Sequence, residues 1–253
     1  MPGAAGRVTR AAGDAGDEAS VADLLQTLRA RPATLPQTTE ELSATQAAAR
    51  VALSTLVDDA GGAASVDLVI GAGRTIAAAP HPGQSARMLL DGLRPMGVTQ
   101  LAVDAAALLG PLGSLPDDEL REGTALLAED LVVPLGTAVV TRGGEPGQLA
   151  MRVTAHRAGW PTPAPVDVRV GQLHVLPLPR GQEAELTVEP GPGVTLGGGR
   201  RSPRIHARAT GGAVGLILDA RGVPIALPRR GDDRRAVLGA WRDALLHETD
   251  GLT

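Results

Sequence analysis

The change in hydrophobic pattern near residue 130 is the feature that most restricts how this chain can fold. Beyond this point six apolar or alternating segments follow one another, separated at short intervals by Gly and Pro: DLVVPLGTAVVTRG, GQLAMRVTAHRAG, PVDVRVGQLHVLPLP, QEAELTVEP, RIHARAT and AVGLILDARGVPIALP. Closely spaced short strands with turns between them predict an antiparallel β sandwich or barrel. A closing helix is expected over about residues 232–247, with its apolar side chains against the sheet.

The first 60 residues have helical periodicity instead. Residues 20–30 place apolar side chains along one helical face, and Ser20 is expected to cap this helix. A second helix is expected over about 38–57, because it opens with Thr38-x-x-Glu41, which has the pattern of a capping box. The sequence therefore predicts a helical lead-in.

Between these regions the chain has an α/β pattern. The run VDLVI at 66–70 has the continuous apolar character of a strand buried on both faces. A helix over about 83–93, a strand over 97–104 and a further helix starting near Pro116 are expected after it. The predicted fold class is therefore α+β, in three parts: a helical lead-in (1–60), a small α/β region (61–129) and a β-rich C-terminal domain with its closing helix (130–253).

The composition excludes several classes of chemistry. The chain has no Cys, which removes thiol nucleophiles, disulfides and Cys-based metal sites. It has no Lys among its 24 basic residues, which removes a Walker-type phosphate lysine and any Schiff base. With no Phe or Tyr, only two Trp and a net charge of −4, we expect no nucleic-acid partner. No apolar run is long enough to span a membrane and the N-terminus lacks a signal-peptide pattern, so a cytoplasmic location is expected.

Two segments are candidates for binding. Gly71-Ala72-Gly73 follows an apolar run, but Ile76 stands where a dinucleotide-binding fingerprint needs its third glycine, so a structural corner is the stronger interpretation of the pattern alone. The second segment places Arg200, Arg201 and Arg204 beside three consecutive glycines. Such a loop can bind an anion through backbone N–H groups and guanidinium forks, although a solvated hairpin loop is the more common reason for the pattern.

Metal and hydrolase sites are not indicated. The five His residues show no H-x-H or H-E-x-x-H spacing, so no metal site is expected. Ser85 lies in G-Q-S-A-R, which lacks the last glycine of a nucleophile elbow. Asp67 and Asp104 stand at the ends of predicted strands, where a single acid is more often a cap or a surface group than a catalytic residue. No catalytic residue is therefore assigned.

Several strings in order along the chain resemble one protein family. VDLVIGAGRTIAAAPHPGQSARMLLDGLRPMGVTQLAVD, LGPLGSL, VPLGTAVV, GQLHVLPLPRGQEAELTVEP and GGAVGLILDARGVPIALP resemble the C-terminal part of the MutL-type (GlmL) accessory protein of adenosylcobalamin-dependent glutamate mutase. The likeness covers about residues 20–245. It implies a partial lobe of the ATPase fold shared by sugar kinases, heat-shock chaperones and actin, and a partner that is a cobalamin-dependent mutase or the family's N-terminal ATPase lobe.

The resemblance also bears on the Gly71 turn. It implies that residues 66–80 correspond to an adenosine-side motif, with Gly71 and Gly73 as the positions that would approach a nucleotide. The family's Ser-Gly-Gly reads Ala72-Gly73-Arg74 here, so the second glycine is an arginine where close backbone approach is needed. The resemblance therefore implies a degenerate site, with ATP or ADP binding only in the presence of the missing lobe.

Three functional hypotheses remain from the sequence. The first is a non-catalytic accessory or binding protein of MutL type, present as a C-terminal fragment or split-gene half and without activity as an isolated chain. The second is one half of an ATPase or kinase that a separate N-terminal lobe completes. The third, a self-sufficient enzyme on a β scaffold, is the weakest because no nucleophile–base pair or metal cluster can be assembled from the sequence.

Overall fold

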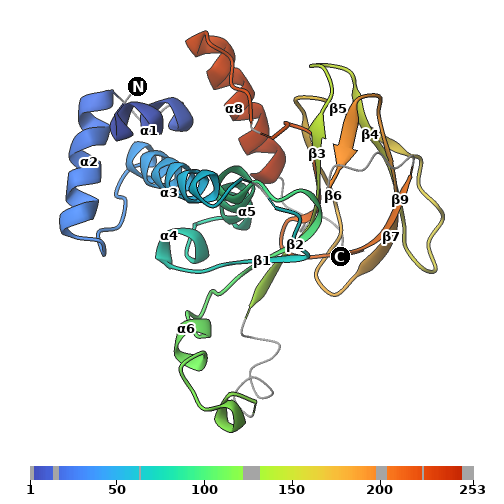
Figure 1. Cartoon of the computed structure of the whole chain (residues 1–253), viewed down its shortest axis with the longest axis horizontal. Coiled ribbons are helices and arrows are strands. Elements are labelled where there is room, and N and C mark those ends of the chain that lie inside the picture. The colour runs from blue at the N-terminus through green and yellow to red at the C-terminus, as the bar shows by residue number, and fades with distance from the viewer. Residues whose placement is uncertain are drawn as a thin grey trace.

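Two β-sheets and a group of helices make up the computed structural model, which describes residues 3–13, 17–62, 64–121, 132–197, 204–223 and 225–246. Figure 1 shows the helices on one side of the molecule and the stacked sheets on the other. The helices are α1 (Ala4–Ala12), α2 (Glu18–Ala30), α3 (Thr39–Asp59), α4 (Arg74–Ala77), α5 (Pro82–Leu93), α6 (Leu109–Leu112) and α8 (Gly231–Leu246).

The larger sheet has six strands, in the order β1-β2-β3-β10-β6 with β8 also paired to β3. Its strands are β1 (Leu68–Gly71), β2 (Gly97–Val103), β3 (Val133–Gly143), β6 (Leu173–Leu176), β8 (Val194–Leu196) and β10 (Gly215–Asp219). β1 runs parallel to β2 and β3 runs parallel to β10, whereas the other pairs are antiparallel. The sheet is therefore mixed.

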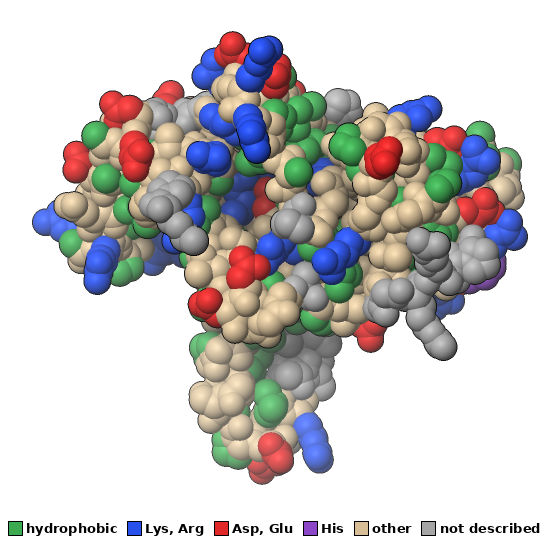
Figure 2. All heavy atoms as spheres, turned by 45° about the horizontal axis from the view of Figure 1, so that its top comes forward, with side chains coloured by type: hydrophobic (Ala, Val, Ile, Leu, Met, Phe, Trp, Pro, Cys, Tyr) green, Lys and Arg blue, Asp and Glu red, His purple; other side chains and the backbone are tan. Residues whose placement is uncertain are grey.

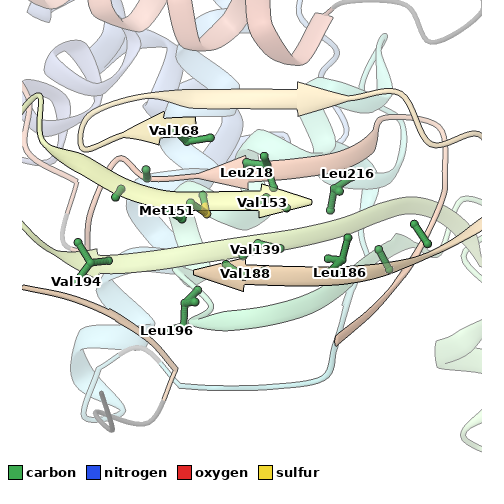
Figure 3. Close-up of a cluster of buried hydrophobic side chains, with 14 of the residues drawn as sticks. Val139, Met151, Val153, Val168, Leu186, Val188, Val194, Leu196, Leu216 and Leu218 are labelled. Atoms are coloured by element: carbon green, nitrogen blue, oxygen red, sulfur yellow. The ribbon is translucent and has the colours of Figure 1, made fainter. Parts of the chain in front are cut away.

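The smaller sheet has four antiparallel strands in the order β5-β4-β7-β9. Its strands are β4 (Leu149–His156), β5 (Val166–Arg169), β7 (Glu183–Pro190) and β9 (Ile205–Thr210). Figure 3 shows apolar side chains of both sheets filling the space between them, among them Val139, Leu216 and Leu218 from the larger sheet and Met151 and Val188 from the smaller. The predicted sandwich is present in this form. Neither sheet closes into a barrel in the described residues, and one of the two is mixed rather than antiparallel.

The opposite face of the larger sheet carries the helices α5 and α8. Because side chains alternate between the faces of a strand, Ile217 of β10 points to this side while its neighbours Leu216 and Leu218 point into the sandwich. Leu89 of α5 and Trp241 of α8 are buried in the same cluster as Ile217. The closing helix is thus confirmed, and the indole Nε1 of Trp241 donates a hydrogen bond to the Gly171 carbonyl at 3.0 Å.

The six-stranded sheet crosses the boundary predicted at residue 130. β1 and β2 precede this residue and the other four strands of the sheet follow it. The hydrophobic cluster under α5 and α8 likewise joins side chains from both sides, such as Leu101 and Leu135. In the described residues the two predicted segments therefore share one sheet and one core.

One predicted strand has a different environment from the one expected. The segment at 66–70 does form a strand, β1, but it is an edge strand with Leu68 and Ile70 exposed, so the prediction that both faces are buried was wrong. Val69 packs into the core beneath α5, and Gly71 at the end of the strand is buried. An apolar run predicts a strand with apolar side chains, but it does not predict whether that strand is central or at the edge of its sheet.

The helical lead-in forms a small core of its own. Val8 of α1, Val21 of α2 and Ala47 of α3 are buried together. Helix α2 begins earlier than expected, because Asp17 and not Ser20 is the N-cap, and its carboxylate accepts a hydrogen bond from the Ser20 N–H at 2.8 Å. Thr38 caps α3 as predicted by accepting from the Glu41 N–H, while Glu41 itself accepts from the N–H of Gln37 rather than from that of Thr38.

A thin extension leaves the body of the molecule after β2. It contains α6 and a helical turn over residues 117–121, and Figure 1 shows it reaching away from the sheets.

None of the helices in the part of the chain that the structure describes has both the length and the apolar character of a membrane span.

Candidate functional site

The turn at Gly71 and Gly73 is shaped by packing on one side and by backbone conformation on the other. A Cβ on Gly71 would lie 2.6 Å from Cγ2 of Ile76, so this position admits no side chain without a shift of its neighbours. Gly73 has φ +86°, a left-handed conformation that favours glycine, and it precedes the single turn of α4. These geometries meet the requirements of a tight strand-to-helix corner.

Arg74 packs across this corner. Its guanidinium Nη1 donates a hydrogen bond to the Ala33 carbonyl, in the loop between α2 and α3, at 2.9 Å. The arginine that replaces the family's second glycine therefore bonds to the backbone of the helical lead-in. The interpretation of this turn as a structural corner accounts for all three observed features.

Asp104 and the serine near this turn also have structural roles. The buried carboxylate of Asp104 accepts hydrogen bonds from the backbone N–H groups of Leu108 and Leu109, at 2.9 and 3.1 Å, and so fixes the turn after β2. The Ser85 hydroxyl donates to the Ile76 carbonyl at 2.6 Å. Among the described residues no group of three or more His, Asp and Glu side chains is placed to hold a metal ion.

The arginine-rich loop is only partly within the described residues. Arg200 and Arg201 lie outside them, so their interpretation as anion ligands stays a prediction. Arg204, at the start of β9, forms an ion pair with Glu189 of the neighbouring strand β7. The next arginine on that strand, Arg208, pairs with Glu183 and Glu185 at 3.5 and 3.6 Å. The described arginines of this segment thus form an exposed cross-strand charge ladder.

A cluster of charged side chains that the sequence patterns did not indicate lies beneath α5. Asp91 of α5 is bound by Arg221 at 2.6 Å and by Arg50 of α3 at 3.0 Å, and Arg87 lies 3.4 Å from it. Arg221 also pairs with Asp219 at 2.7 Å. We refer to these five residues as the arginine–aspartate cluster.

Burial and mutual attraction compete in this cluster. Burial alone would raise the pKa of Asp91, but Arg221, Arg50 and Arg87 outweigh it and hold that pKa below its ordinary value. Burial alone would lower the pKa of Arg221, but Asp219 and Asp91 raise it above its ordinary value. Burial has the largest effect on the pKa of Arg87, and repulsion from Arg50 has the next largest. Together they lower this pKa to about 10. Asp91, Arg87 and Arg221 are therefore charged at neutral pH.

The signal that could have indicated this cluster is the presence of charge in apolar strings. Asp91 interrupts the apolar run LLDGL of α5, Asp219 ends the apolar strand β10, and Arg221 follows two residues later. A charged side chain on the buried side of an amphipathic element needs a partner. The identity of that partner depends on tertiary contacts, because Asp91 and Arg221 are 130 positions apart.

Beside the cluster is a cavity of about 280 Å³ between α3, the first turns of α5 and the helix α8. Arg50 and Arg87 line its inner wall, Arg235 and Arg242 of α8 line another part, and Leu42 and Leu245 contribute apolar surface. Figure 2 shows basic side chains gathered over and beside α8. This cavity and the exposed strand β1 both have the character of binding sites.

Comparison with known proteins adds no assignment to this geometry: no family model, no curated protein and no solved structure matches the chain.

Proposed function

We propose that this chain is a non-catalytic accessory protein that acts by binding a partner at the free edge of its six-stranded sheet. The resemblance to the MutL-type accessory family supports an ATPase-type lobe as that partner, acting together with a cobalamin-dependent mutase. The observation that carries the proposal is the exposure of β1. This strand pairs on one side only in the described residues, with β2.

The exposed side chains of β1 continue the apolar face of the sandwich. Leu68 is 50% exposed and Ile70 is 37% exposed, and both point away from the helix-covered face into which Val69 packs. They thus extend the face that the smaller sheet covers further along, where Gln100 of β2 reaches Thr210 of β9. The apolar face therefore extends beyond the sheet that covers it.

An edge strand of this kind is a template for pairing with another chain. Its free N–H and C=O groups can accept a further strand, and its apolar side chains add area to the contact. Proteins commonly protect such edges with charges, prolines or bulges, and the segment from Leu68 to Gly71 contains none of these. A lobe docked here would meet the Gly71–Gly73 turn at the end of the same strand, so any ATP or ADP binding would require that lobe.

The test uses the full chain, the ATPase-type lobe of a MutL-type protein supplied as a separate chain, and the corresponding glutamate mutase. We expect the chain to bind the lobe with or without the mutase in surface plasmon resonance. Replacing both Leu68 and Ile70 by Lys should weaken this binding at least tenfold, because two charges would have to be desolvated at the contact. Leu56→Lys is the matched control: Leu56 is 64% exposed on α3, away from β1, and its replacement should leave binding unchanged.

Two results would contradict the proposal. Equal loss of binding in the Leu56→Lys control would show that a general charge effect is at work rather than the β1 edge. Mg²⁺-dependent ATP hydrolysis by the pure chain would favour the alternative of an ATPase or kinase half. We expect no such turnover, because catalysis of phosphoryl transfer depends on groups that position Mg²⁺ and phosphate, and the described residues contain no cluster fit to hold a metal ion.

A further inference from the structure

The cavity beside the arginine–aspartate cluster contains buried hydrogen-bond donors without acceptors. Within the described ranges, neither Nε nor Nη2 of Arg87 has a hydrogen-bond partner, although Nε lies in an ion pair 3.4 Å from Asp91. The side chain of Arg87 is only 15% exposed. Nε2 of Gln46, on the facing helix α3, is a second buried donor for which no described residue is a hydrogen-bond partner. Both residues line the cavity.

Among the described residues, the charges around the cavity do not balance. The cluster holds three guanidinium groups, on Arg50, Arg87 and Arg221, against two carboxylates, on Asp91 and Asp219, so one positive charge is left over. The rim arginines do not alter this count, because Arg235 pairs with Asp232 and Arg242 lies 3.3 Å from Asp243. Buried charges in proteins are ordinarily balanced by partners, so a surplus positive charge in this cluster of described residues is unusual.

The positions of the donors and the charge specify the chemistry of a ligand. An anion that reaches the guanidinium of Arg87 would accept hydrogen bonds from it and neutralise the surplus charge in one contact. The first turn of the 12-residue helix α5 faces the same space through Gly83 and Gln84, and the positive end of the helix dipole adds to the attraction. Gly83 has no room for a side chain, since a Cβ there would lie 1.9 Å from the Leu245 carbonyl oxygen.

We propose that this cavity is a binding site for a small organic monocarboxylate, whose carboxylate group pairs with Arg87 and whose carbon chain lies against Leu42 and Leu245. A single negative charge matches the single surplus positive charge, whereas a phosphate dianion would leave a buried negative charge. The volume of about 280 Å³ lies just below the usual range of drug-sized pockets, about 300–1,000 Å³, and so fits a compact ligand. Leu42, Leu238 and Leu245 provide the apolar wall.

The site is separate from the proposed contact at β1. It lies between α3, α5 and α8, whereas β1 is the outer edge of the six-stranded sheet. Binding of a carboxylate and binding of a partner lobe can therefore be measured independently, and failure of either proposal leaves the other standing.

The test is calorimetric titration of the full chain at pH 7 with valerate, with inorganic phosphate and with neutral valeramide. We expect saturable binding of valerate, at least tenfold weaker binding of valeramide and weaker binding of phosphate than of valerate. The absence of saturation by valerate up to about 10 mM would overturn the site. Equal affinity for valerate and valeramide would also overturn it, because charge would then play no part. Tighter binding of phosphate would overturn the assignment to a monocarboxylate.

Variants identify the residue responsible. Arg87→Met keeps most of the side-chain stem and removes the donors, and it should weaken valerate binding at least tenfold. Arg234→Met is the matched control, because Nε of Arg234 is also buried without a hydrogen-bond partner in the part of the chain that the structure describes, but this residue does not line the cavity. Thermal unfolding of both variants establishes that they fold. Unchanged valerate affinity in a folded Arg87→Met variant contradicts the proposal, and the comparison of valerate with valeramide on the unaltered chain decides it if that variant does not fold.

Discussion

The two faces of the six-stranded sheet are buried by different means. One face packs against the smaller sheet through apolar side chains, such as Val139, Leu216 and Met151. The other face packs against α5 and α8, and there a similar apolar layer is joined by the arginine–aspartate cluster. The apolar packing gives way to charged packing at Asp219. This residue ends the strand β10, whose preceding residues are apolar on both faces of the sheet.

This difference determines how each face responds to substitution. Apolar contacts are non-directional, so a core of this kind depends mainly on volume and pattern. A buried ion pair loses several kcal/mol on desolvation and recovers them only through its specific partners. The sandwich face should therefore tolerate conservative changes, whereas the helix-covered face should not tolerate the loss of any partner in the cluster.

The largest effect is expected from Arg221→Met. This change removes the side chain that bonds to both Asp91 and Asp219, and it leaves Asp219 without its ion-pair partner among the described residues. It also removes the cation–π contact of Arg221 with Trp241, at 5.1 Å from the ring centroid. We expect the free energy of unfolding in urea to fall by about 3–5 kcal/mol.

The control for Arg221→Met is Arg152→Met. Arg152 makes two hydrogen bonds to Asp167, at 2.6 and 2.8 Å, but both side chains are nearly half exposed. Its loss should cost less than about 1 kcal/mol, because water screens such a pair. Equal costs for the two variants would contradict the distinction between the buried cluster and the surface.

Acid should act on the helix-covered face before the sandwich face. The pKa of Asp91 is held below its ordinary value of 3.8 by Arg221, Arg50 and Arg87. The unfolded chain therefore takes up its proton first, so the contribution of Asp91 to stability is present above pH 3.8 and is lost as the pH falls below it. We expect urea midpoints to fall below this pH, with a smaller dependence in Asp91→Asn. An identical pH dependence in this variant would show that other carboxylates are responsible.

A conservative change in the sandwich core should have a modest effect. Leu218 is fully buried between the sheets. Leu218→Met keeps the volume and the apolar character, so we expect a loss of less than about 1.5 kcal/mol. Arg221→Lys is similarly conservative in charge but cannot reproduce the guanidinium fork, and it should cost more. Urea unfolding of both proteins measures the difference, and a larger loss for Leu218→Met would reverse the comparison.

The smallest effect is expected at the Gly71–Gly73 corner. Arg74→Gly combined with Ala72→Ser restores the pattern of the resembling family and removes the exposed bond to Ala33. Thermal and urea unfolding should show a change within about 1 kcal/mol, as for surface turns. Gly71→Ala is the comparison, and it should cost more because its Cβ would contact Ile76. If the double variant were the less stable of the two, the bond of Arg74 to the lead-in would be a major support of the fold.

Sequence periodicity predicted which segments form elements but not which elements become neighbours. The strings LVI and LIL are both fully apolar, yet the first lies in the exposed edge strand β1 and the second in the central strand β10. Position in a sheet follows from long-range pairing, and a local pattern does not contain that information. For the same reason the continuity of the sheet across residue 130 was not predicted.

The candidate sites also differ in how far the sequence could predict them. The geometry of Gly71 and Gly73 follows from local turn chemistry, and the sequence favoured a structural corner there. The arginine–aspartate cluster depends on the meeting of α3, α5 and the end of β10, which lie far apart along the chain. Charged residues in apolar strings indicate that partners exist, but only the tertiary structure identifies them.

The parallel pairing of β3 with β10 has a consequence for the order of folding. The two strands are joined by register pairs such as Thr137 with Leu216, which are about 80 residues apart, and all four strands of the smaller sheet lie between them in the chain. Pairings of such long range slow folding, because the entropy of closing the loop is lost before any contact forms. During synthesis the smaller sheet can assemble as soon as its own strands emerge. The larger sheet cannot be completed until β10 has emerged, and its helix-covered face cannot be completed until α8 has emerged. The apolar side chains that α8 covers therefore stay exposed until α8 has been synthesised.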